Sequence, residues 1–189
     1  MSAMKKVFLV GLLFVTSITV AQTSNLELKK IVEEDQGVRT TGTQIDWKTV
    51  SRSDADRRLL VRKMIDAGQL HTAEDYRGAA LVFQHGSQSD DYLLAHSLAV
   101  IAASKGDKIG LRLAAATLDR YLQSQKQPQI YGTQYFTIEN TPATQEPYNK
   151  SLVTDEIRKQ LRVPTVKEQE SQRKEFDAKR TTSATNSAK

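Results

Sequence analysis

The chain has 189 residues, with 27 lysines and arginines, 22 aspartates and glutamates, three histidines and no cysteine. This length suits one ordinary domain with its own core rather than two domains. The absence of cysteine excludes disulfides, thiolate zinc sites, iron–sulfur clusters and cysteine nucleophiles. A formal charge of +5 invites a nucleic-acid interpretation, whose merit depends on where along the chain the charges lie.

Residues 1–21 have the pattern of a secretory signal peptide. Lys5 and Lys6 precede an apolar run of 14 residues from Val7 to Val20. As a helix this run would span about 21 Å, which is short of the roughly 30 Å hydrocarbon core of a bilayer. We therefore predict export to the periplasm or the extracellular space after cleavage near Ala21, with an uncleaved anchor as the alternative.

Residues 22–148 are predicted to form one helical domain, with the densest core over 72–136. Its first helix starts after Asn25 and ends near Gln36, and a second runs from Ser53 to Gly68. Three closely spaced helices follow over 73–86, 89–104 and 108–124, capped at their starts by residues such as Thr72 and Asp107. The middle one is apolar all round, so we expect it to be buried on most sides.

The predicted fold class is mainly α, a compact bundle of repeat-like antiparallel helix hairpins. Ala79-Ala80 and Ala114-Ala115 stand 35 residues apart, close to the period of tetratricopeptide-type hairpins. Fewer than three copies are visible in the sequence. A compact bundle is therefore favoured over an extended solenoid.

The chain changes character after residue 126. The segment Gln127–Phe136 is rich in glutamine and aromatic residues and starts next to a proline, which favours a short hairpin or an ordered loop across the bundle. Residues 140–149 read as a linker. Within residues 149–189, Thr154 can cap a short helix. Thr165 with Glu168 can form a capping box for a last, charged helix that ends at about Lys179. Residues 181–189 are predicted to be a disordered tail.

The positive charge is confined to the two ends of the chain. Residues 149–189 hold ten Lys and Arg against six Asp and Glu, whereas residues 22–148 hold fifteen against sixteen. The basic end could touch anionic wall or membrane surfaces weakly, but the neutral domain offers no basic face for nucleic acid. We expect no nucleic-acid partner and no stable membrane span; the sequence leaves the oligomeric state open.

The sequence lacks the motifs of common catalytic sites. It has no H-E-x-x-H, no Gly-rich phosphate loop and no G-x-S-x-G elbow. His85 at a helix end is explained by capping of free carbonyls, and His96 is best read as a neutral imidazole bonded to a neighbour. Their depths differ by roughly 9 Å along the helices, so we expect no shared metal and predict no metal site and no cofactor.

Asp119-Arg120 is the most interesting polar pair, because it interrupts an otherwise apolar helix face. A half-buried Asp119 could serve as a general base, although pairing with Arg112, Arg120 or the following loop is the simpler interpretation. The following segment contributes neutral donors, acceptors and aromatic surface of the kind found in polar-ligand sites. The residues concerned are Gln127, Gln129, Tyr131, Gln134 and Tyr135.

Four short elements, in order along the chain, resemble one known family. They are Asp35-Gln36 with Arg39, Gln84-His85, Asp119-Arg120 and Tyr131-Gly-Thr-Gln134. Over about residues 26–165 the chain resembles the bacterial domain-of-unknown-function family 6624. Because that family has no assigned activity, the resemblance implies a mostly helical fold and a set of residues to watch: Asp35, Gln36, Arg39, His85, Asp119, Arg120 and Gln134.

Two hypotheses for function follow from the sequence. The first is a non-catalytic, exported module that binds a peptide, glycan or protein partner through the face formed by helix 108–124 and the Gln/Tyr segment. The alternative is a secreted hydrolase or lyase in which His85 and Asp119 act as acid and base while Arg120 and Gln134 hold the substrate. Convergence of His85, Asp119 and Gln134 in one pocket would favour the enzyme.

Overall fold

The computed structural model describes residues 23–40, 45–138 and 141–187, and within them the protein is mainly α-helical with no β-strand. Its helices are α1 (Leu26–Gly37), α2 (Trp47–Asp66), α3 (Ala73–Phe83), α4 (Ser89–Ser104), α5 (Lys108–Ser124), α6 (Asp155–Gln160) and α7 (Val166–Ser187). The predicted fold class is confirmed. The predicted signal peptide lies outside the described residues.

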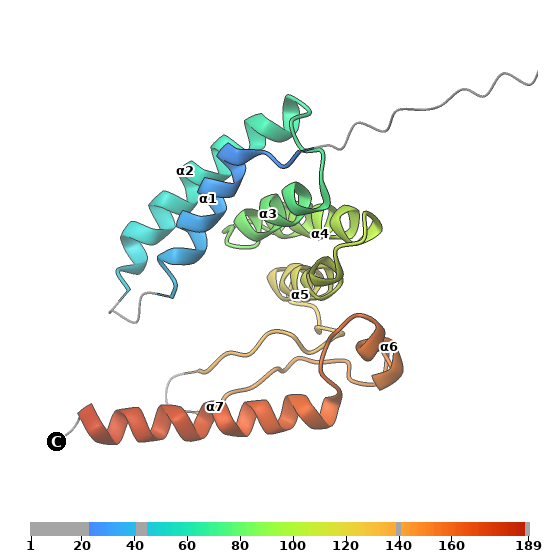
Figure 1. The fold of residues 1–189 in the computed structure, drawn as a ribbon. Helices are drawn as coiled ribbons and strands as arrows, with labels where there is room; N and C mark the ends of the chain where they lie inside the picture. Colours follow the sequence, from blue (N-terminus) through green and yellow to red (C-terminus); the bar gives the residue numbers. More distant parts are fainter. Residues whose placement is uncertain (1–22, 41–44, 139–140, 188–189) are drawn as a thin grey trace, which may run out of the picture.

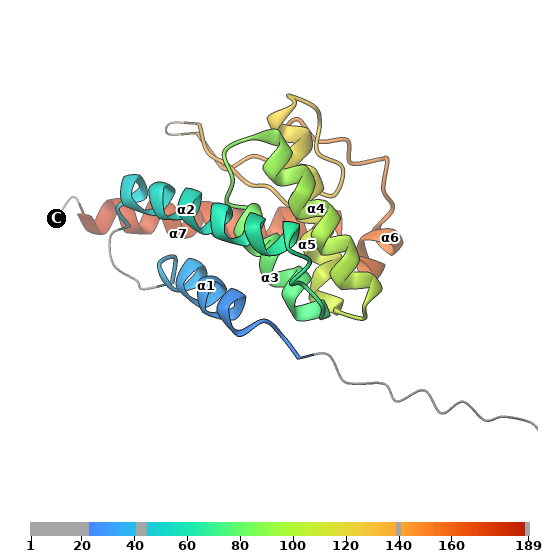
Figure 2. The same ribbon diagram turned by 90° about the horizontal axis from the view of Figure 1, so that it is seen from above.

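The helices α3, α4 and α5 form an antiparallel layer, and α1 with α2 packs as a pair against α3 (Figures 1 and 2). The core lies mainly between α1, α2, α3 and α4, where residues such as Leu28, Val61, Val82 and Leu98 are buried. On the far side of α5, an irregular segment and the two C-terminal helices complete the molecule (Figure 1). Within the described ranges, no helix combines the length and hydropathy that a membrane crossing requires.

Capping residues explain most of the helix starts. Thr72 and Asp75 form a reciprocal capping box on α3, and the Asp75 carboxylate also accepts the backbone N–H of Asn25 at 2.7 Å. This contact ties the start of α1 to the start of α3. Asp107 and Thr154 cap α5 and α6 as predicted.

Two helices differ from the prediction. Helix α2 begins at Trp47, capped by the Asp46 side chain, so Ser53 lies inside the helix rather than at its start. Helix α4 is not buried on most sides, because Leu93, Val100 and Ile101 are exposed. Its buried residues are Leu98 and the alanines Ala95, Ala99 and Ala102. Ala99 and Ala103 closely approach Gly110 of α5.

The Gln/Tyr-rich segment after α5 forms an ordered loop with two isolated bridges. Gln129 bridges Tyr148 in parallel and Phe136 bridges Thr144 in antiparallel orientation. Of the two predicted alternatives, the ordered loop is present, and the described residues of this segment form no strand that would make a hairpin. We call residues 129–134, which lie against the end of α5, the glutamine loop.

The charged C-terminal helices are docked onto this loop rather than free. Gln169 of α7 is almost completely buried and donates from Nε2 to the carbonyl oxygens of Tyr131 (2.8 Å) and Pro164 (2.7 Å). Arg158 of α6, also buried, donates to the Tyr148 hydroxyl at 2.9 Å and to the Lys150 carbonyl at 3.1 Å. Helix α7 continues to Ser187, beyond the predicted end near Lys179 and through residues that were expected to be disordered.

Candidate functional site

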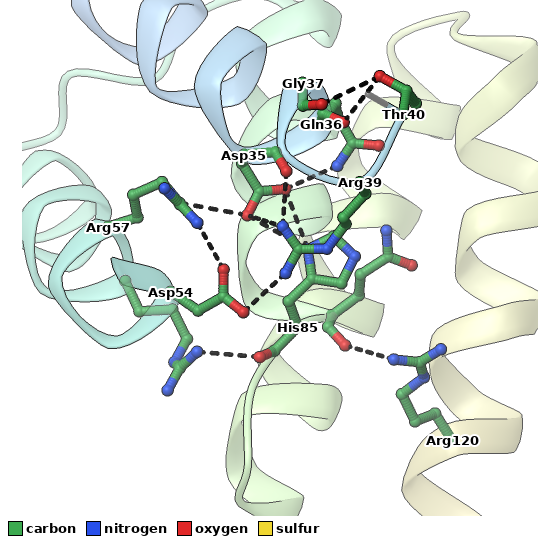
Figure 3. A network of polar contacts seen from close by, with 11 residues as sticks. Asp35, Gln36, Gly37, Arg39, Thr40, Asp54, Arg57, His85 and Arg120 are labelled. Atoms are coloured by element: carbon green, nitrogen blue, oxygen red, sulfur yellow. Dashed lines mark hydrogen bonds and ion pairs between the residues drawn. The ribbon is translucent and has the colours of Figure 1, made fainter. Parts of the chain in front are cut away.

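Nine of the residues singled out in the sequence fall into two groups in the structure. One group gathers around the C-terminal end of α3 and consists of Asp35, Gln36, Arg39, His85, Arg120 and Gln134. The other group stabilises the glutamine loop and consists of Asp119, Gln129 and Tyr131. Asp35 contacts Gln36, Arg39 and His85 directly, and Arg120 bonds to the carbonyl of Gln84, the neighbour of His85 (Figure 3). Gln134 joins the group through Arg120.

Asp35 is the centre of a charged network between α1, α2 and the end of α3 (Figure 3). It is completely buried and its carboxylate lies 3.0 Å from His85 Nδ1 and 2.6 Å from Gln36 Nε2. The His85 tautomer that carries its proton on Nδ1 is the one that can donate to a carboxylate here. Arg39 Nη1 lies 3.4 Å from the same carboxylate and donates to the Asp35 backbone carbonyl at 2.6 Å.

Sequence reasoning missed two members of this network, Asp54 and Arg57 of α2. Asp54 receives Arg39 Nη2 and Arg57 Nη2, each at 2.6 Å. Arg57 Nε lies 3.4 Å from the Asp35 carboxylate but without hydrogen-bond geometry. Burial raises the pKa of Asp54, yet the hydrogen bonds and charges of Arg39 and Arg57 outweigh that penalty and hold the pKa below its ordinary value of 3.8.

This shifted pKa predicts how stability depends on pH. A carboxyl whose pKa is lower in the folded than in the unfolded chain contributes stability above its ordinary pKa and loses it as the pH falls through the folded value. We expect the free energy of unfolding to drop as the pH falls below about 4. The drop should be shallower in the Asp54→Asn variant. Urea titrations at several pH values measure this, with exposed Asp56→Asn as control; equal slopes in parent and Asp54→Asn would contradict it.

His85 is a partner of Asp35 rather than the simple helix cap of the sequence interpretation. It follows the last turn of α3, and its backbone carbonyl accepts Arg58 Nη1 at 3.0 Å. Arg58 also approaches Asp91, which accepts the backbone N–H groups of Ser87 and Gln88. The turn between α3 and α4 is therefore fixed by α2, and the orientation of the His85 ring is set by α1.

Arg120 reaches the same end of α3 from α5. Its Nη1 donates to the Gln84 carbonyl at 2.9 Å, its Nε donates to Gln134 Oε1 at 3.3 Å, and its guanidinium lies 5.9 Å from the centre of the Tyr92 ring. Gln134 in turn donates from Nε2 to the Ala116 carbonyl at 3.0 Å. Gln134 thus positions Arg120, so the two predicted ligand-holding residues do converge.

Asp119 is committed to the glutamine loop. It is completely buried and accepts the backbone N–H groups of Ile130 (2.8 Å), Tyr131 (3.0 Å) and Thr133 (2.9 Å), together with the Thr133 hydroxyl at 2.8 Å. This is the loop pairing that the sequence offered as the simpler interpretation. A carboxylate with four donors already bound has little capacity left to take a proton from a substrate.

The other two loop residues also have structural partners. Gln129 is completely buried, and its side chain accepts the Gln134 N–H at 3.0 Å and donates to the Gln134 and Gln145 carbonyls. The Tyr131 carbonyl accepts from Tyr148 and Gln169. Burial and, to a lesser extent, the charge of Asp119 raise the pKa of the Tyr131 hydroxyl.

A pocket of about 330 Å³ opens between α3, α5 and the glutamine loop. Arg112, Ala116 and Arg120 line it from one face of α5, and Thr133 and Gln134 line it from the glutamine loop. Apolar side chains form much of the wall, including Leu81, Ile109 and Leu113. We call this cavity the α5 pocket; neither His85 nor Asp119 lines it.

The remaining histidines show no sign of metal binding. His96 Nδ1 lies 2.9 Å from the Ala114 carbonyl, so the predicted bond to a neighbour is present. The His71 backbone N–H donates to Asp75. Across the part of the chain that the structure describes, no three His, Asp or Glu side chains gather in a way that could hold a metal ion.

Comparisons with protein-family models, curated proteins and solved structures found no match. The resemblance to family 6624 therefore stays a prediction. The features that bear on function are the network around α3 and the α5 pocket.

Proposed function

We propose that the chain is an exported, non-catalytic binding module that holds a peptide, glycan or protein partner at the α5 pocket. The observation that carries this proposal is the pocket itself, which opens on the face of α5 and the glutamine loop. Its volume of about 330 Å³ is at the lower end of ligand pockets, which are mostly apolar with a few placed polar groups.

The chemistry of the neighbouring residues supports binding more than catalysis. The hydrolase or lyase alternative needs His85 and Asp119 to face one substrate, but His85 bonds to Asp35 of α1 and Asp119 to the glutamine loop. In the α5 pocket, by contrast, Arg120 is held rigidly by neutral acceptors. A preorganised donor of this kind reduces the entropy lost when a ligand binds.

Filling the pocket tests the proposal. Ala116→Leu adds apolar volume at a residue that lines the pocket, so we expect binding of any ligand there to weaken by about tenfold or more while the fold persists. The measurement is thermal shift of the mature chain against panels of short peptides and oligosaccharides, followed by titration of the hits. Exposed Ala67→Leu is the matched control, and a hit that binds Ala116→Leu as tightly as the parent contradicts the proposal.

A further inference from the structure

Several arginines around the end of α3 are paired with carboxylates, but Arg120 is not. Arg39 and Arg57 share Asp54, and Arg58 pairs with Asp91. Farther along α3, Arg77 pairs with Asp107 at 2.6 Å. Among the described residues no carboxylate forms an ion pair with Arg120, whose partners are the neutral oxygens of Gln84 and Gln134 and the Tyr92 ring.

The environment of Arg120 makes its charge costly. The pKa of its guanidinium is lowered, mainly because the group is buried. Tyr92 raises this pKa and the like charge of Arg39 lowers it, both by less than burial does. A half-buried cation without a counter-ion is an expensive arrangement, since desolvation is not offset by an opposite charge. An anion that enters the pocket beside Arg120 would provide that offset.

Arg112 places a second positive charge on the same pocket. Arg112, Ala116 and Arg120 are spaced by four residues, so they follow one face of α5, and the two arginines start about 12 Å apart along the helix axis. The small Ala116 between them leaves room for a ligand. Arg112 is exposed, and within the described ranges no carboxylate pairs with it.

The rest of the lining defines what must be attached to the anion. The pocket has an apolar surface formed by Leu81, Ile109, Leu113 and Ala116. The backbone carbonyl of Gln84 accepts a hydrogen bond from Arg120. The side-chain amide of Gln84 forms no hydrogen bond within the described part of the chain. A ligand that fits this lining combines an oxyanion, a short apolar group and an amide. Sugar rings, whose hydroxyls need many polar partners, fit it less well.

We propose that the α5 pocket binds the C-terminal carboxylate of a peptide whose last residue is apolar. The carboxylate takes the remaining N–H groups of Arg120, the last side chain packs on Leu113 and Ala116, and the peptide backbone bonds to the Gln84 amide. Arginine suits this role because its planar fork matches a carboxylate in a bidentate pair. This inference rests on the proposed function, because it names the ligand class of the same pocket.

The test compares two probes that differ only in the terminal charge. N-acetyl-Ala-Leu as the free acid and as the C-terminal amide are titrated into isotope-labelled protein, and the backbone amide signals of Gln84, Leu113 and Ala116 are followed by NMR. We expect the acid to bind about tenfold or more tightly than the amide, because a hydrogen bond to a charged group carries more free energy than a neutral one. High salt should reduce the difference.

Variants assign the preference to the arginines. Arg120→Gln should remove most of the preference for the acid, and Arg112→Gln, at an exposed residue that the fold does not need, should reduce it about threefold. Arg52→Gln, an exposed arginine on α2, makes the same charge change elsewhere and should leave the preference intact. If Arg120→Gln fails to fold, Arg112→Gln and the salt dependence still decide the outcome.

The outcomes separate this inference from the proposed function. Equal binding of acid and amide at the pocket overturns the carboxylate inference and leaves the pocket as a binding site. The carboxylate inference is also overturned if glucuronic acid shifts the same NMR signals and the peptide acid shifts none of them. That result would favour an acidic glycan as the ligand. If neither these probes nor the peptide and oligosaccharide panels reach the pocket, both proposals fail.

Discussion

Replacing Asp35 with asparagine should lower the free energy of unfolding by about 3–5 kcal/mol, the range for breaking a buried ion pair by removing one partner. Asp35 is completely buried and carries the negative charge that faces His85, Arg39 and Arg57. An asparagine keeps the volume but leaves these donors without their charged acceptor. The loss should be felt across α1, α2 and α3 together, because the network joins all three helices.

The measurement is urea denaturation of the protein for parent and variant at pH 7. We expect a lower midpoint with an unchanged slope, which reports a change in stability rather than in the compactness of either state. Asp56→Asn, an exposed carboxyl in the middle of α2, removes the same charge and should change stability by no more than about 0.5 kcal/mol. A similarly small effect of Asp35→Asn would show that the network does not stabilise the fold.

Local signals in the sequence predicted most of the helices because capping depends on neighbouring residues. The boxes at Thr72 and Thr165 and the cap at Asp107 are complete within four residues of chain. The predicted start of α2 was wrong because two places in the sequence resemble helix caps. One is Ser53 with Asp56 three residues later, and the other is Asp46, which directly precedes Trp47. The structure selects Asp46, whose carboxylate accepts the N–H groups of Lys48 and Thr49.

The candidate site was predictable as a set of residues but not as a set of contacts. His85 and Asp35 are 50 residues apart, and no periodicity in either helix indicates that they meet. Asp54 and Arg57 were overlooked because α2 carries many charged residues, and the two that face inward look like the others in the sequence. Only the packing of α2 against α1 and α3 distinguishes them.

Asp119 illustrates how one residue supports two opposite interpretations until its partners are known. A general base needs a carboxylate with free acceptor capacity near a substrate. A residue that organises a loop needs the reverse, a carboxylate saturated by backbone donors. The structure places three backbone N–H groups and one hydroxyl on Asp119, so its effect on ligand binding acts through the shape of the glutamine loop.

Asp119→Asn is therefore expected to loosen the glutamine loop and to cost about 2–5 kcal/mol, because at least two buried donors lose their acceptor. The asparagine NH₂ group would itself be a donor facing donors. Backbone amides of Ile130, Tyr131 and Thr133 should exchange with solvent faster by hydrogen exchange, whereas amides of the α1 and α3 core should change less.

The consequence should reach the α5 pocket, because Gln134 at the end of this loop positions Arg120. We expect Asp119→Asn to weaken ligand binding together with loop protection, while exposed Asp66→Asn on α2 changes neither. If Asp119 were instead an acid or base in catalysis, the asparagine variant would keep its loop protection and lose only turnover. Unchanged exchange at Ile130, Tyr131 and Thr133 would thus contradict the structural role and revive the catalytic one.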